Sequence, residues 1–549
     1  MSRAAAIPGV DAEPRGRVTE AAPARRRIAV VAGTLAIAFL GLAARATQLA
    51  FAGDPLADAR GRGEAAAPMR ADLLDRNGAI LATTLPSFTL VAEPANVWDA
   101  PSVARKLAAL FPDLDAATVE RRLSQKNLSV VYLKRNVSPK QRDAVFEQGL
   151  AGVSFRDDST RVYPQGDLAA HLVGGVSSEN KGYAGVESGL DAEILRAGAL
   201  GKPVRLSVDI RVQHALEAEL DRSIKASSAE GAAGIILDGK TGEVLAMASL
   251  PSFNPNDPPA PDSDVRLNRA ARAVYEMGSS LKPFTVAMGL EAGVTTPDEI
   301  FDLSKPLPVG DIVVQDYKGL GRPASLAESF ADSSNIMAAT IALRVGAERQ
   351  RAALRELGLY DRAVLQLPET ARPILPRQDN AVTTAVLGYG HGMAMSLAAL
   401  ADAYTVFAND GARVQTTLLA RESGDAPAKT KVFEPKTART VLALMRRVVT
   451  DGTGRRADVP GLEIAGKTGS AEKPNDKGVY VPDSLFSSFA AVFPASKPQY
   501  VIVVALDQPK ATAESGNLAT GGAVAAPTVG RIAARMAPLM NVTPKRGVE

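Results

Sequence analysis

The longest apolar run of this chain lies near its N-terminus, at residues 28–44, and carries no charged residue until Arg45. Three arginines, Arg25-Arg26-Arg27, precede it directly. A helix over these residues would be about 26 Å long, close to the hydrocarbon thickness of a bilayer. The pattern therefore predicts a single transmembrane anchor over residues 28–46.

A cleaved signal peptide is the alternative interpretation, because Ala50-Phe51-Ala52 resembles a signal-peptidase site. The apolar run is longer than a usual signal core and Arg45 follows it at once, which favours an uncleaved anchor. The arginine cluster stays cytoplasmic by the positive-inside rule. We therefore expect everything after residue 45 to lie outside the cytoplasm.

A mixed pattern follows the anchor, up to about residue 225. Asn77-Gly78 stands between two apolar runs and predicts a hairpin turn, since this pair readily adopts positive φ. Apolar spacings of three and four predict helices over residues 101–125, 139–149 and 212–220, and residues 204–209 read as a strand.

The pattern changes at Gly231, where two apolar runs around a glycine-rich turn predict a β-hairpin over residues 231–250. Strands return at residues 462–465, 487–493 and 500–506. Helical spacing dominates between them, over residues 281–292, 325–345, 348–357, 397–408 and 436–449. Strands at both ends with helices between them predict an α+β domain, in which one sheet is built from both ends and covered by helices.

The chain has 549 residues and is too long for one compact domain. We expect six segments: a disordered tail at 1–27, the anchor at 28–46, a linker at 47–68, a mixed α+β pedestal at 69–225, a larger α+β domain at 226–540 and a C-terminal tail at 541–549.

Composition excludes several classes of function. The 63 basic residues are nearly matched by 60 acidic ones, which argues against a dedicated nucleic-acid binder. The chain has no cysteine, so neither a disulfide framework nor a thiolate zinc site can form. The chain has three histidines, which provide few imidazole ligands for a hydrolytic metal site. We therefore expect no metal and no cofactor.

The first candidate motif is Ser279-x-x-Lys282. Ser279 follows Gly278 and opens an apolar helical run, which places Lys282 one turn from the serine hydroxyl. A second copy, Ser178 with Lys181, lies in a turn-rich stretch without a helix to fix the pair. Taken alone, the motif fits an ordinary N-cap serine and a surface lysine equally well.

The second candidate is Ser333-Ser334-Asn335, one of four Ser-x-Asn patterns in the chain. It interrupts the strongly apolar helical region at residues 325–345 with polar groups. Buried polar groups need partners, and a lysine amine is a suitable one. The alternative is a cap at a break between helices.

The third candidate is Lys467-Thr468-Gly469, which follows the strand expected at residues 462–465. Glycine in such a place lets a substrate backbone approach closely. The other Lys-Thr-Gly copy begins at Lys240 and is explained by the hairpin turn that it forms.

Residues 461–468 also fit the phosphate-binding pattern G-x-x-x-x-G-K-T. A phosphate-binding loop must lead directly into a helix. Pro474 and Gly478 follow shortly after and disfavour that helix, and the expected orientation of the chain places this region outside the cytoplasm.

Together and in this order, the three motifs resemble those of penicillin-binding proteins and serine β-lactamases. The flanking sequences resemble class B penicillin-binding proteins, and the moderate length is closer to the septal, cell-division type. These flanks are DRNGAILA (75–82), RVYPQGDLAAHLVG (161–174), GVESGLD (185–191), PSFNPN (251–256), YEMGSSLKP (275–283), GYGHGMAMSLAALADAYTVFANDG (388–411) and AGKTGSAEK (465–473).

The resemblance implies an α/β sandwich: a penicillin-binding transpeptidase domain with a central antiparallel sheet flanked by helices, carried on an elongated pedestal. It implies a peptidoglycan D,D-transpeptidase that forms an acyl-enzyme on Ser279. The implied catalytic residues are Ser279, Lys282, Ser333, Asn335 and Lys467. Substrate would be bound by Thr468, Gly469 and Ser470, and the oxyanion hole would be formed by the backbone N–H groups of Ser279 and Ser470.

The implied partners are peptidoglycan stem peptides and lipid-linked precursor strands, β-lactams, a membrane glycan polymerase of the SEDS family and proteins of the divisome, without nucleic acid. The implied location is the bacterial inner membrane at the division septum, with the catalytic domain in the periplasm. Ser470 stands where this family usually has threonine; it keeps the hydroxyl, so carboxylate binding should survive.

Two alternatives remain open. One is a D,D-carboxypeptidase or β-lactamase-like hydrolase of the same fold; rapid penicillin hydrolysis is not expected, because no Glu-x-x-Leu-Asn segment lies between Asn335 and Lys467. The other is a non-catalytic membrane-anchored scaffold or β-lactam sensor. His391, in GYGHG, is expected to be a structural loop residue, since no nucleophile-elbow sequence surrounds Ser279.

Overall fold

The computed structural model describes residues 30–31, 33–34, 36–43, 69–422, 424–475 and 479–545, in two units that divide after Ala67. The described residues of the first unit are helical and exposed. Within the described ranges, no helix combines the length and the apolar character needed to cross a membrane. The expected tail (1–27) and linker (47–68) lie outside the described residues, and the expected anchor (28–46) lies inside them only in part.

The pedestal begins with the predicted hairpin, formed by β1 (Leu73–Leu74) and β2 (Ile80–Ala92). The carboxylate of Asp75 closes the turn by accepting hydrogen bonds from the backbone N–H groups of Asn77 and Ala79, both at 2.8 Å. Gly78 adopts φ +94°, which agrees with the turn chemistry expected of Asn-Gly.

The long strand β2 pairs antiparallel with β3 (Val131–Val137) and β4 (Val153–Val162), and β1 pairs in parallel with β7 (Val204–Arg205). The strand expected at 204–209 is thus only two residues long. A core of apolar side chains joins this sheet to the helices α3 (Ala100–Leu110), α4 (Ala116–Leu123) and α5 (Pro139–Phe146). The helix expected over 101–125 is therefore two helices, because Asp115 caps a new N-terminus by accepting from the N–H of Thr118 at 2.9 Å.

A buried ion-pair network lies within the pedestal. Glu187 accepts from Arg70 Nη2 and Arg161 Nε, both at 2.7 Å, and the carboxylate is fully buried. The surrounding elements are short: α6 (Ala170–Val173), β5 (Gly175–Val176), β6 (Gly182–Ala184), α7 (Gly185–Gly189) and α8 (Asp191–Ala199).

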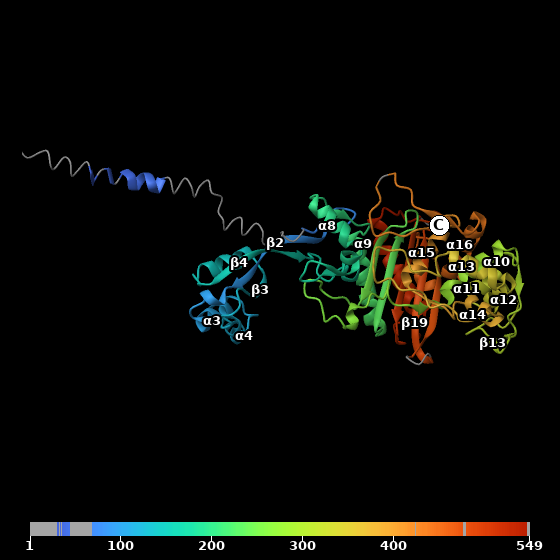
Figure 1. The fold of residues 1–549 in the computed structure, drawn as a ribbon. Helices are drawn as coiled ribbons and strands as arrows, with labels where there is room; N and C mark the ends of the chain where they lie inside the picture. Colours follow the sequence, from blue (N-terminus) through green and yellow to red (C-terminus); the bar gives the residue numbers. More distant parts are fainter. Residues whose placement is uncertain are drawn as a thin grey trace, which may run out of the picture. The chain divides into compact units, whose positions relative to one another are not determined.

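The larger domain is built on a five-stranded antiparallel sheet in the order β18-β19-β20-β8-β9. As the sequence predicts, strands from both ends of the domain share this one sheet (Figure 1). Its strands are β8 (Gly231–Asp238), β9 (Val244–Leu250), β18 (Ala465–Pro474), β19 (Tyr480–Phe493) and β20 (Tyr500–Asp507).

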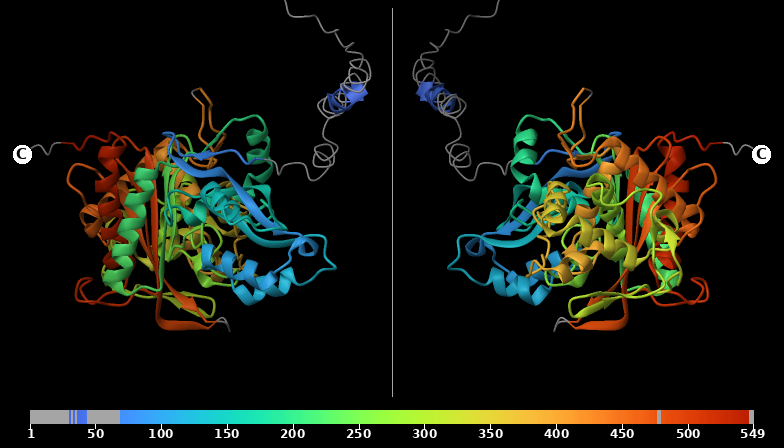
Figure 2. Two further views of the ribbon diagram at one scale, coloured as in Figure 1. Left: turned by 90° about the vertical axis from the view of Figure 1, so that its left-hand side faces the viewer. Right: turned by 90° about the vertical axis from the view of Figure 1, so that its right-hand side faces the viewer.

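Both faces of the sheet are apolar and covered. Along β20, Val501 and Val503 face one core while Ile502 and Val504 face the other, as the two-residue period of a strand requires. Helices α9 (Ile210–Ser227) and α17 (Gly521–Leu539) cover the second face side by side (Figure 2). Helix α15 (Leu397–Ala408) packs on the first face and coincides with the helix expected there.

The first face also supports the helices that position the candidate site. Figure 1 shows α10, α11, α12 and α14 together beyond α15. The remaining helices of the domain are α10 (Lys282–Glu291), α11 (Leu326–Ala331), α12 (Asn335–Val345), α13 (Ala347–Glu356), α14 (Ala381–Gly388) and α16 (Pro435–Thr450). Four short strand pairs accompany them: β10 (Tyr275–Glu276) with β15 (Ala394–Met395), β11 (Ile300–Phe301) with β14 (Ala324–Ser325), β12 (Leu307–Val309) with β13 (Ile312–Val314), and β16 (Ala412–Val414) with β17 (Lys429–Lys431).

Two expectations about these elements are wrong. The helix expected over 325–345 is interrupted at residues 332–334, where Ser333 adopts φ +67°. The strand expected at 462–465 ends where β18 begins, so Lys467-Thr468-Gly469 lies inside an edge strand and not after one. Its glycines and lysines disfavour a strand locally, and pairing with β19, such as Lys467 opposite Ala490, imposes it.

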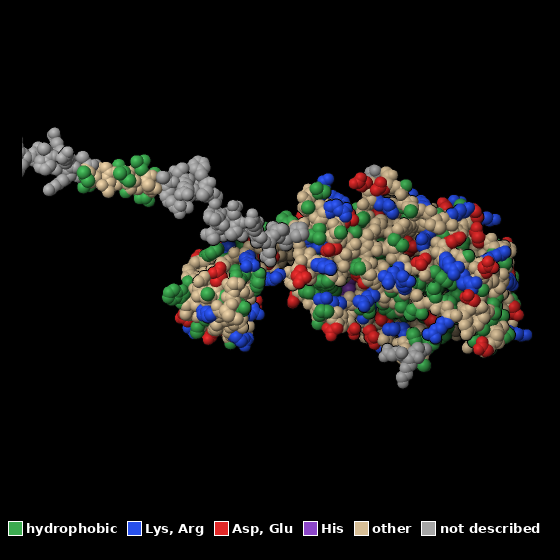
Figure 3. All heavy atoms as spheres, in the orientation of Figure 1, with side chains coloured by type: hydrophobic (Ala, Val, Ile, Leu, Met, Phe, Trp, Pro, Cys, Tyr) green, Lys and Arg blue, Asp and Glu red, His purple; other side chains and the backbone are tan. Residues whose placement is uncertain are grey.

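The charged residues on the visible face of the 69–545 unit are of both signs and interspersed (Figure 3). This distribution agrees with the near balance of charge in the sequence and shows no single basic stripe on that face of the unit.

Candidate active site

Ser279 lies in a short 3₁₀ turn, η3 (Gly278–Leu281), that leads directly into α10. The helix expected over residues 281–292 is α10, which begins at Lys282, and the apolar run that Ser279 opens begins with the 3₁₀ turn. The Ser279 side chain is half-buried at this turn. It remains partly accessible, as a nucleophile must be.

Three contacts hold the turn around Ser279 in place. Gly278 has φ +51°, and a Cβ on it would lie 2.7 Å from the carbonyl oxygen of Ser470 on β18. The N–H of Gly278 donates to the carbonyl of Gly390 at 3.0 Å. The Tyr404 hydroxyl of α15 donates to the carbonyl of Ser280 at 2.6 Å. The candidate nucleophile is therefore fixed between β18, the 388–392 loop and α15.

Lys282 is fully buried at the start of α10. Its Nζ donates to Asn335 Oδ1 at 2.7 Å and to Ser333 Oγ at 3.2 Å, and it also contacts the carbonyl oxygen of Ser333. Burial lowers the pKa of Lys282 to about 7, although the carboxylates of Asp316 and Asp332 act in the opposite direction. A lysine with this pKa can accept a proton at neutral pH.

The Ser333-Ser334-Asn335 segment is the corner between α11 and α12. The positive φ of Ser333 costs about 1–2 kcal/mol for a residue other than glycine. The Ser334 hydroxyl caps α12 by accepting from the N–H of Met337 at 3.0 Å. The two interpretations of this motif are both correct, since Ser334 caps a helix break while Ser333 and Asn335 bind a lysine.

Lys467, on β18, contacts the corner between α11 and α12 as Lys282 does, but from a different element. Its Nζ donates to Ser333 Oγ at 2.8 Å and to the carbonyl of Thr468 at 3.2 Å, and its side chain is fully buried. Burial holds the pKa of Lys467 well below its usual range, and the neighbouring charge of Lys282 lowers it further.

The residues after Lys467 differ in their surroundings. A Cβ on Gly469 would lie 2.4 Å from the hydroxyl oxygens of Ser280 and Ser488, so glycine is required by close packing. The Thr468 hydroxyl bonds with that of Thr453 at 2.9 Å. The Ser470 hydroxyl accepts from the N–H of Gly521, at the start of α17, at 2.9 Å. Its own proton can still be donated to a ligand.

Asp316, which sequence reasoning missed, is part of the same cluster. Its carboxylate accepts from the Ser334 hydroxyl at 2.8 Å and from the backbone N–H groups of Asn335 and Ile336 at 2.5 and 3.1 Å. Asp316 lies 18 residues before Ser334 with another helix between them, so no periodic pattern in the sequence connects the two.

The other copies of the Ser-x-x-Lys and Lys-Thr-Gly patterns, at Ser178 and at Lys240, lie outside this cluster. Ser178 is in the pedestal, where its carbonyl accepts from Arg135 at 2.7 Å. Lys240 bonds to the carbonyl of Ala408 at the hairpin turn. The ring of His391 lies against Tyr389, with 5.5 Å between centroids, and its buried Nδ1 has no hydrogen-bond partner among the described residues.

The segment that follows Lys467-Thr468-Gly469 is the remainder of β18 and not a helix, which removes the basis for a phosphate-binding loop. Among the described residues, no group of three or more His, Cys, Asp and Glu side chains is placed to hold a metal ion.

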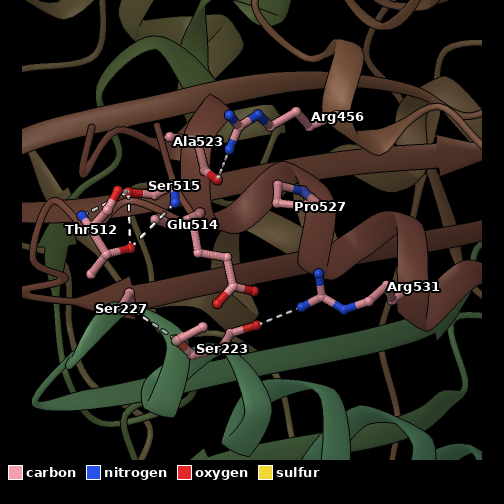
Figure 4. Close-up of a pocket in the computed structure, with 11 residues that line it drawn as sticks. Ser223, Ser227, Arg456, Thr512, Glu514, Ser515, Ala523, Pro527 and Arg531 are labelled. Carbon is pink, nitrogen blue, oxygen red and sulfur yellow. Dashed lines mark hydrogen bonds between the residues drawn. The ribbon is translucent and has the colours of Figure 1, made fainter. Parts of the chain in front are cut away.

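One pocket lies apart from this cluster, against α9 and α17 on the other face of the central sheet (Figure 4). Its volume is about 100 Å³. Arg531 donates into it toward Ser223 at 2.9 Å, and Arg456 donates to the carbonyl of Ala523 at 3.1 Å. None of the candidate catalytic residues lines it.

Comparison with known protein families gives two matches. The penicillin binding protein transpeptidase domain matches residues 232–534, and the penicillin-binding protein dimerisation domain matches residues 65–194.

Individual relatives agree with these matches. The chain is 40% identical to the probable peptidoglycan D,D-transpeptidase FtsI of Caulobacter vibrioides, over 87% of this chain and 82% of that protein. It is 28% identical to the peptidoglycan D,D-transpeptidase FtsI of Escherichia coli, over 86% and 84%.

Solved structures show the same similarity. Crystal structures of penicillin binding protein 3 from Mycobacterium tuberculosis, complexed with aztreonam or with ampicillin, share 28% and 27% identity and give TM-scores of 0.69 and 0.70. Each covers 88% of this chain and 98% of the solved one. On the strength of its fold, its three motifs and these relatives, the chain belongs to the class B penicillin-binding proteins of the FtsI type.

Proposed function

We propose that this chain is a septal peptidoglycan D,D-transpeptidase that works through an acyl-enzyme on Ser279. The observation that carries this proposal is the cluster one turn after Ser279, where the two buried amines of Lys282 and Lys467 bind one hydroxyl, that of Ser333. This arrangement provides a proton acceptor and a relay for acyl transfer beside a partly accessible serine.

In the acylation step, Ser279 Oγ attacks the carbonyl carbon of the penultimate D-Ala of a stem peptide. The hydroxyl proton passes to Lys282 Nζ, which is neutral in part at pH 7 because burial lowers its pKa to about 7. The new oxyanion is stabilised by the backbone N–H groups of Ser279 and Ser470, whose segments are brought together by the close contact between Gly278 and Ser470.

The leaving group is the terminal D-Ala, whose nitrogen must gain a proton as the C–N bond breaks. Ser333 Oγ lies within 3.2 Å of Lys282 Nζ and 2.8 Å of Lys467 Nζ, so it can relay that proton. The amine of a neighbouring stem then attacks the ester carbonyl, gives up a proton by the same route and releases Ser279 with the cross-link formed.

The substrate would lie along the edge strand β18. Lys467, Thr468 and Ser470 would bind the terminal carboxylate, and Gly469 would let the peptide backbone approach. Asn335 would bond the substrate amide while its Oδ1 holds Lys282. We propose that β-lactams enter the same site, since crystal structures of penicillin binding protein 3 from Mycobacterium tuberculosis contain aztreonam and ampicillin.

We further propose that residues 28–46 anchor the chain in the inner membrane, with residues 1–27 cytoplasmic and the catalytic domain in the periplasm. The sequence pattern of an uncharged apolar run after three arginines supports this. We also propose a pedestal at 69–225 and a transpeptidase domain at 226–540, which the family matches at 65–194 and 232–534 support. The expected partners are a SEDS-family glycan polymerase and divisome proteins.

The experiment that tests this function combines the full-length chain, a glycan polymerase and lipid-linked precursor. A transpeptidase releases D-Ala and produces cross-linked muropeptides. A carboxypeptidase would release D-Ala without cross-links, and a scaffold or sensor would do neither. Ser279→Ala should abolish both products, while Ser178→Ala, which changes the decoy motif in the pedestal, should leave both unchanged.

A further inference from the structure

Asp316 follows β13 and lies outside the three motifs. Its carboxylate nevertheless accepts hydrogen bonds from the corner at which the Ser333-Ser334-Asn335 motif lies. One carboxylate oxygen, Oδ1, accepts from the backbone N–H groups of Asn335 and Ile336, at 2.5 and 3.1 Å. The other, Oδ2, accepts from the Ser334 hydroxyl at 2.8 Å. The three residues that follow Ser333 are therefore bound to a single side chain.

The same loop also sets the orientation of the Asn335 amide. Asn335 Nδ2 donates to the carbonyl of Gln315 at 3.1 Å, so its Oδ1 is turned toward Lys282 Nζ at 2.7 Å. If the amide were reversed, a donor would face the lysine and the carbonyl of Gln315 would lose its hydrogen bond. The loop is itself packed around Asp316, since a Cβ on Gly319 would lie 2.8 Å from the Cβ of Asp316.

Asp316 also contributes a negative charge that favours a proton on Lys282. Its carboxylate raises the pKa of Lys282 against the effect of burial, and Asp332 acts in the same direction. Two further ionisable groups face this cluster. Burial holds the pKa of Lys467 well below its usual range, and burial also lowers the pKa of the His391 imidazole, with the charge of Lys282 acting in the same direction and that of Glu276 against it. The proton on Lys282 is thus held by two carboxylates in a pocket that otherwise disfavours it.

We infer that Asp316 is a positioning residue for acyl transfer, which holds Asn335 against Lys282 and, through its negative charge, stabilises the protonated form of that lysine. The inference rests on the proposed function, because it assigns the residue that supports the proposed proton acceptor. Asp316 does not contact Lys282 directly; it acts through the Ser334–Asn335 segment and through its charge.

Two substitutions separate these roles. Asp316→Asn keeps the size of the side chain and an oxygen that can accept from the two backbone N–H groups, but it removes the charge. Asp316→Ala removes both. Asp311→Asn is the matched control, since Asp311 is an exposed carboxylate at the turn of the same β12–β13 hairpin.

The measurement is the rate constant for acylation by a fluorescent penicillin between pH 5 and 9, on the full-length chain. In Asp316→Asn the acidic limb of the profile should move to lower pH by about half a unit to one unit, because Lys282 loses its proton more readily. Asp316→Ala should in addition lower the plateau rate by roughly 10- to 100-fold, because Asn335 and Ser333 are no longer held in place. Asp311→Asn should match the wild type in both respects.

The outcomes distinguish this inference from the proposed function. A wild-type chain that takes up no label would refute the function itself. A labelled wild type together with an Asp316→Asn variant whose acidic limb stays at the wild-type pH would overturn the electrostatic role. An Asp316→Ala variant acylated at the wild-type plateau rate would overturn the positioning role. If Asp316→Ala fails to fold, Gly319→Ala displaces the Asp316 side chain by steric contact, and an unchanged plateau rate there would overturn the positioning role instead.

Discussion

Lys282 and Lys467 contact the same atom, the hydroxyl oxygen of Ser333, with their Nζ atoms at 3.2 and 2.8 Å from it. Both side chains are fully buried, which lowers the pKa of each, and the charge of Lys282 lowers the pKa of Lys467 further. A buried pair of amines that shares one hydroxyl is a setting in which one amine readily becomes neutral. The chemistry of the site depends on that neutral form.

The first prediction concerns the pH dependence of acylation. Burial lowers the pKa of Lys282 to about 7, so the lysine is protonated and inactive as a base below that pH and neutral above it. The rate constant for acylation by a β-lactam should therefore rise from pH 6 to pH 8, with a midpoint near 7. Stopped-flow measurement of acylation checks this. A rate that is flat or falls over this interval would exclude Lys282 as the proton acceptor.

A second prediction concerns the close packing at Gly469. A Cβ at this position would lie 2.4 Å from two hydroxyl oxygens and 2.5 Å from the carbonyl oxygen of Met277, which is backbone and cannot turn away. Gly469→Ala should therefore destabilise the domain by about 1–3 kcal/mol and displace η3, with loss of acylation. Urea unfolding and penicillin labelling measure the two effects.

Gly201→Ala is the control for the effect on acylation only, since its added methyl group meets no atom within 4 Å and the backbone strain at its φ of +63° lies in the pedestal. It should leave acylation at the wild-type rate. Normal labelling of Gly469→Ala would show that β18 can move away from η3 without consequence, contrary to the contacts in the structure.

A third prediction concerns the hydroxyl of Ser470. It accepts from the N–H of Gly521 and keeps a proton that can bind the carboxylate of a substrate or a β-lactam. Ser470→Ala should lower the second-order acylation rate constant about 10-fold or more, as expected for loss of a hydrogen bond to a charged group. Ser470→Thr keeps the hydroxyl and should stay within a few-fold of wild type. Equal rates for the alanine and threonine variants would remove Ser470 from carboxylate binding.

A fourth prediction concerns stability and not catalysis. Glu187 is fully buried and pairs with Arg70 and Arg161. Glu187→Ala leaves two buried guanidinium groups without this partner and should destabilise the pedestal by about 3–5 kcal/mol. Asp221→Ala, which breaks the exposed pair with Lys225, should cost less than about 1 kcal/mol. Urea unfolding followed by circular dichroism compares them, and a similar small effect for both would show that the buried network is dispensable.

The parts of the fold that sequence predicts correctly are those with dense apolar periodicity. Nearly every residue of the hairpin at 231–250 and of the helix at 397–408 is buried. Their apolar residues in the sequence are therefore enough to predict both elements. The meeting of the three motifs in one cluster follows from their resemblance to the motifs of penicillin-binding proteins and not from periodicity, and the Ser333 hydroxyl joins Lys282 and Lys467 there.

The parts that sequence does not predict depend on tertiary contacts. Strand β18 is rich in glycine and lysine and forms because β19 pairs with it. Helix α17 contains Pro527 and Pro538 and begins with two glycines. Both residue types have low helix propensity, so propensity alone does not predict this helix. Asp316 joins the site across 18 residues of chain, and only the folded arrangement of the loop after β13 brings it to α12.

The most direct test of Ser279 as the nucleophile is peptide mapping by mass spectrometry after reaction with a fluorescent penicillin. The wild-type chain should carry one adduct, on Ser279, and the adduct should be absent in Ser279→Ala and unchanged in Ser178→Ala. An adduct on Ser280, Ser333 or another residue, or one that persists in Ser279→Ala, would contradict the assignment of Ser279.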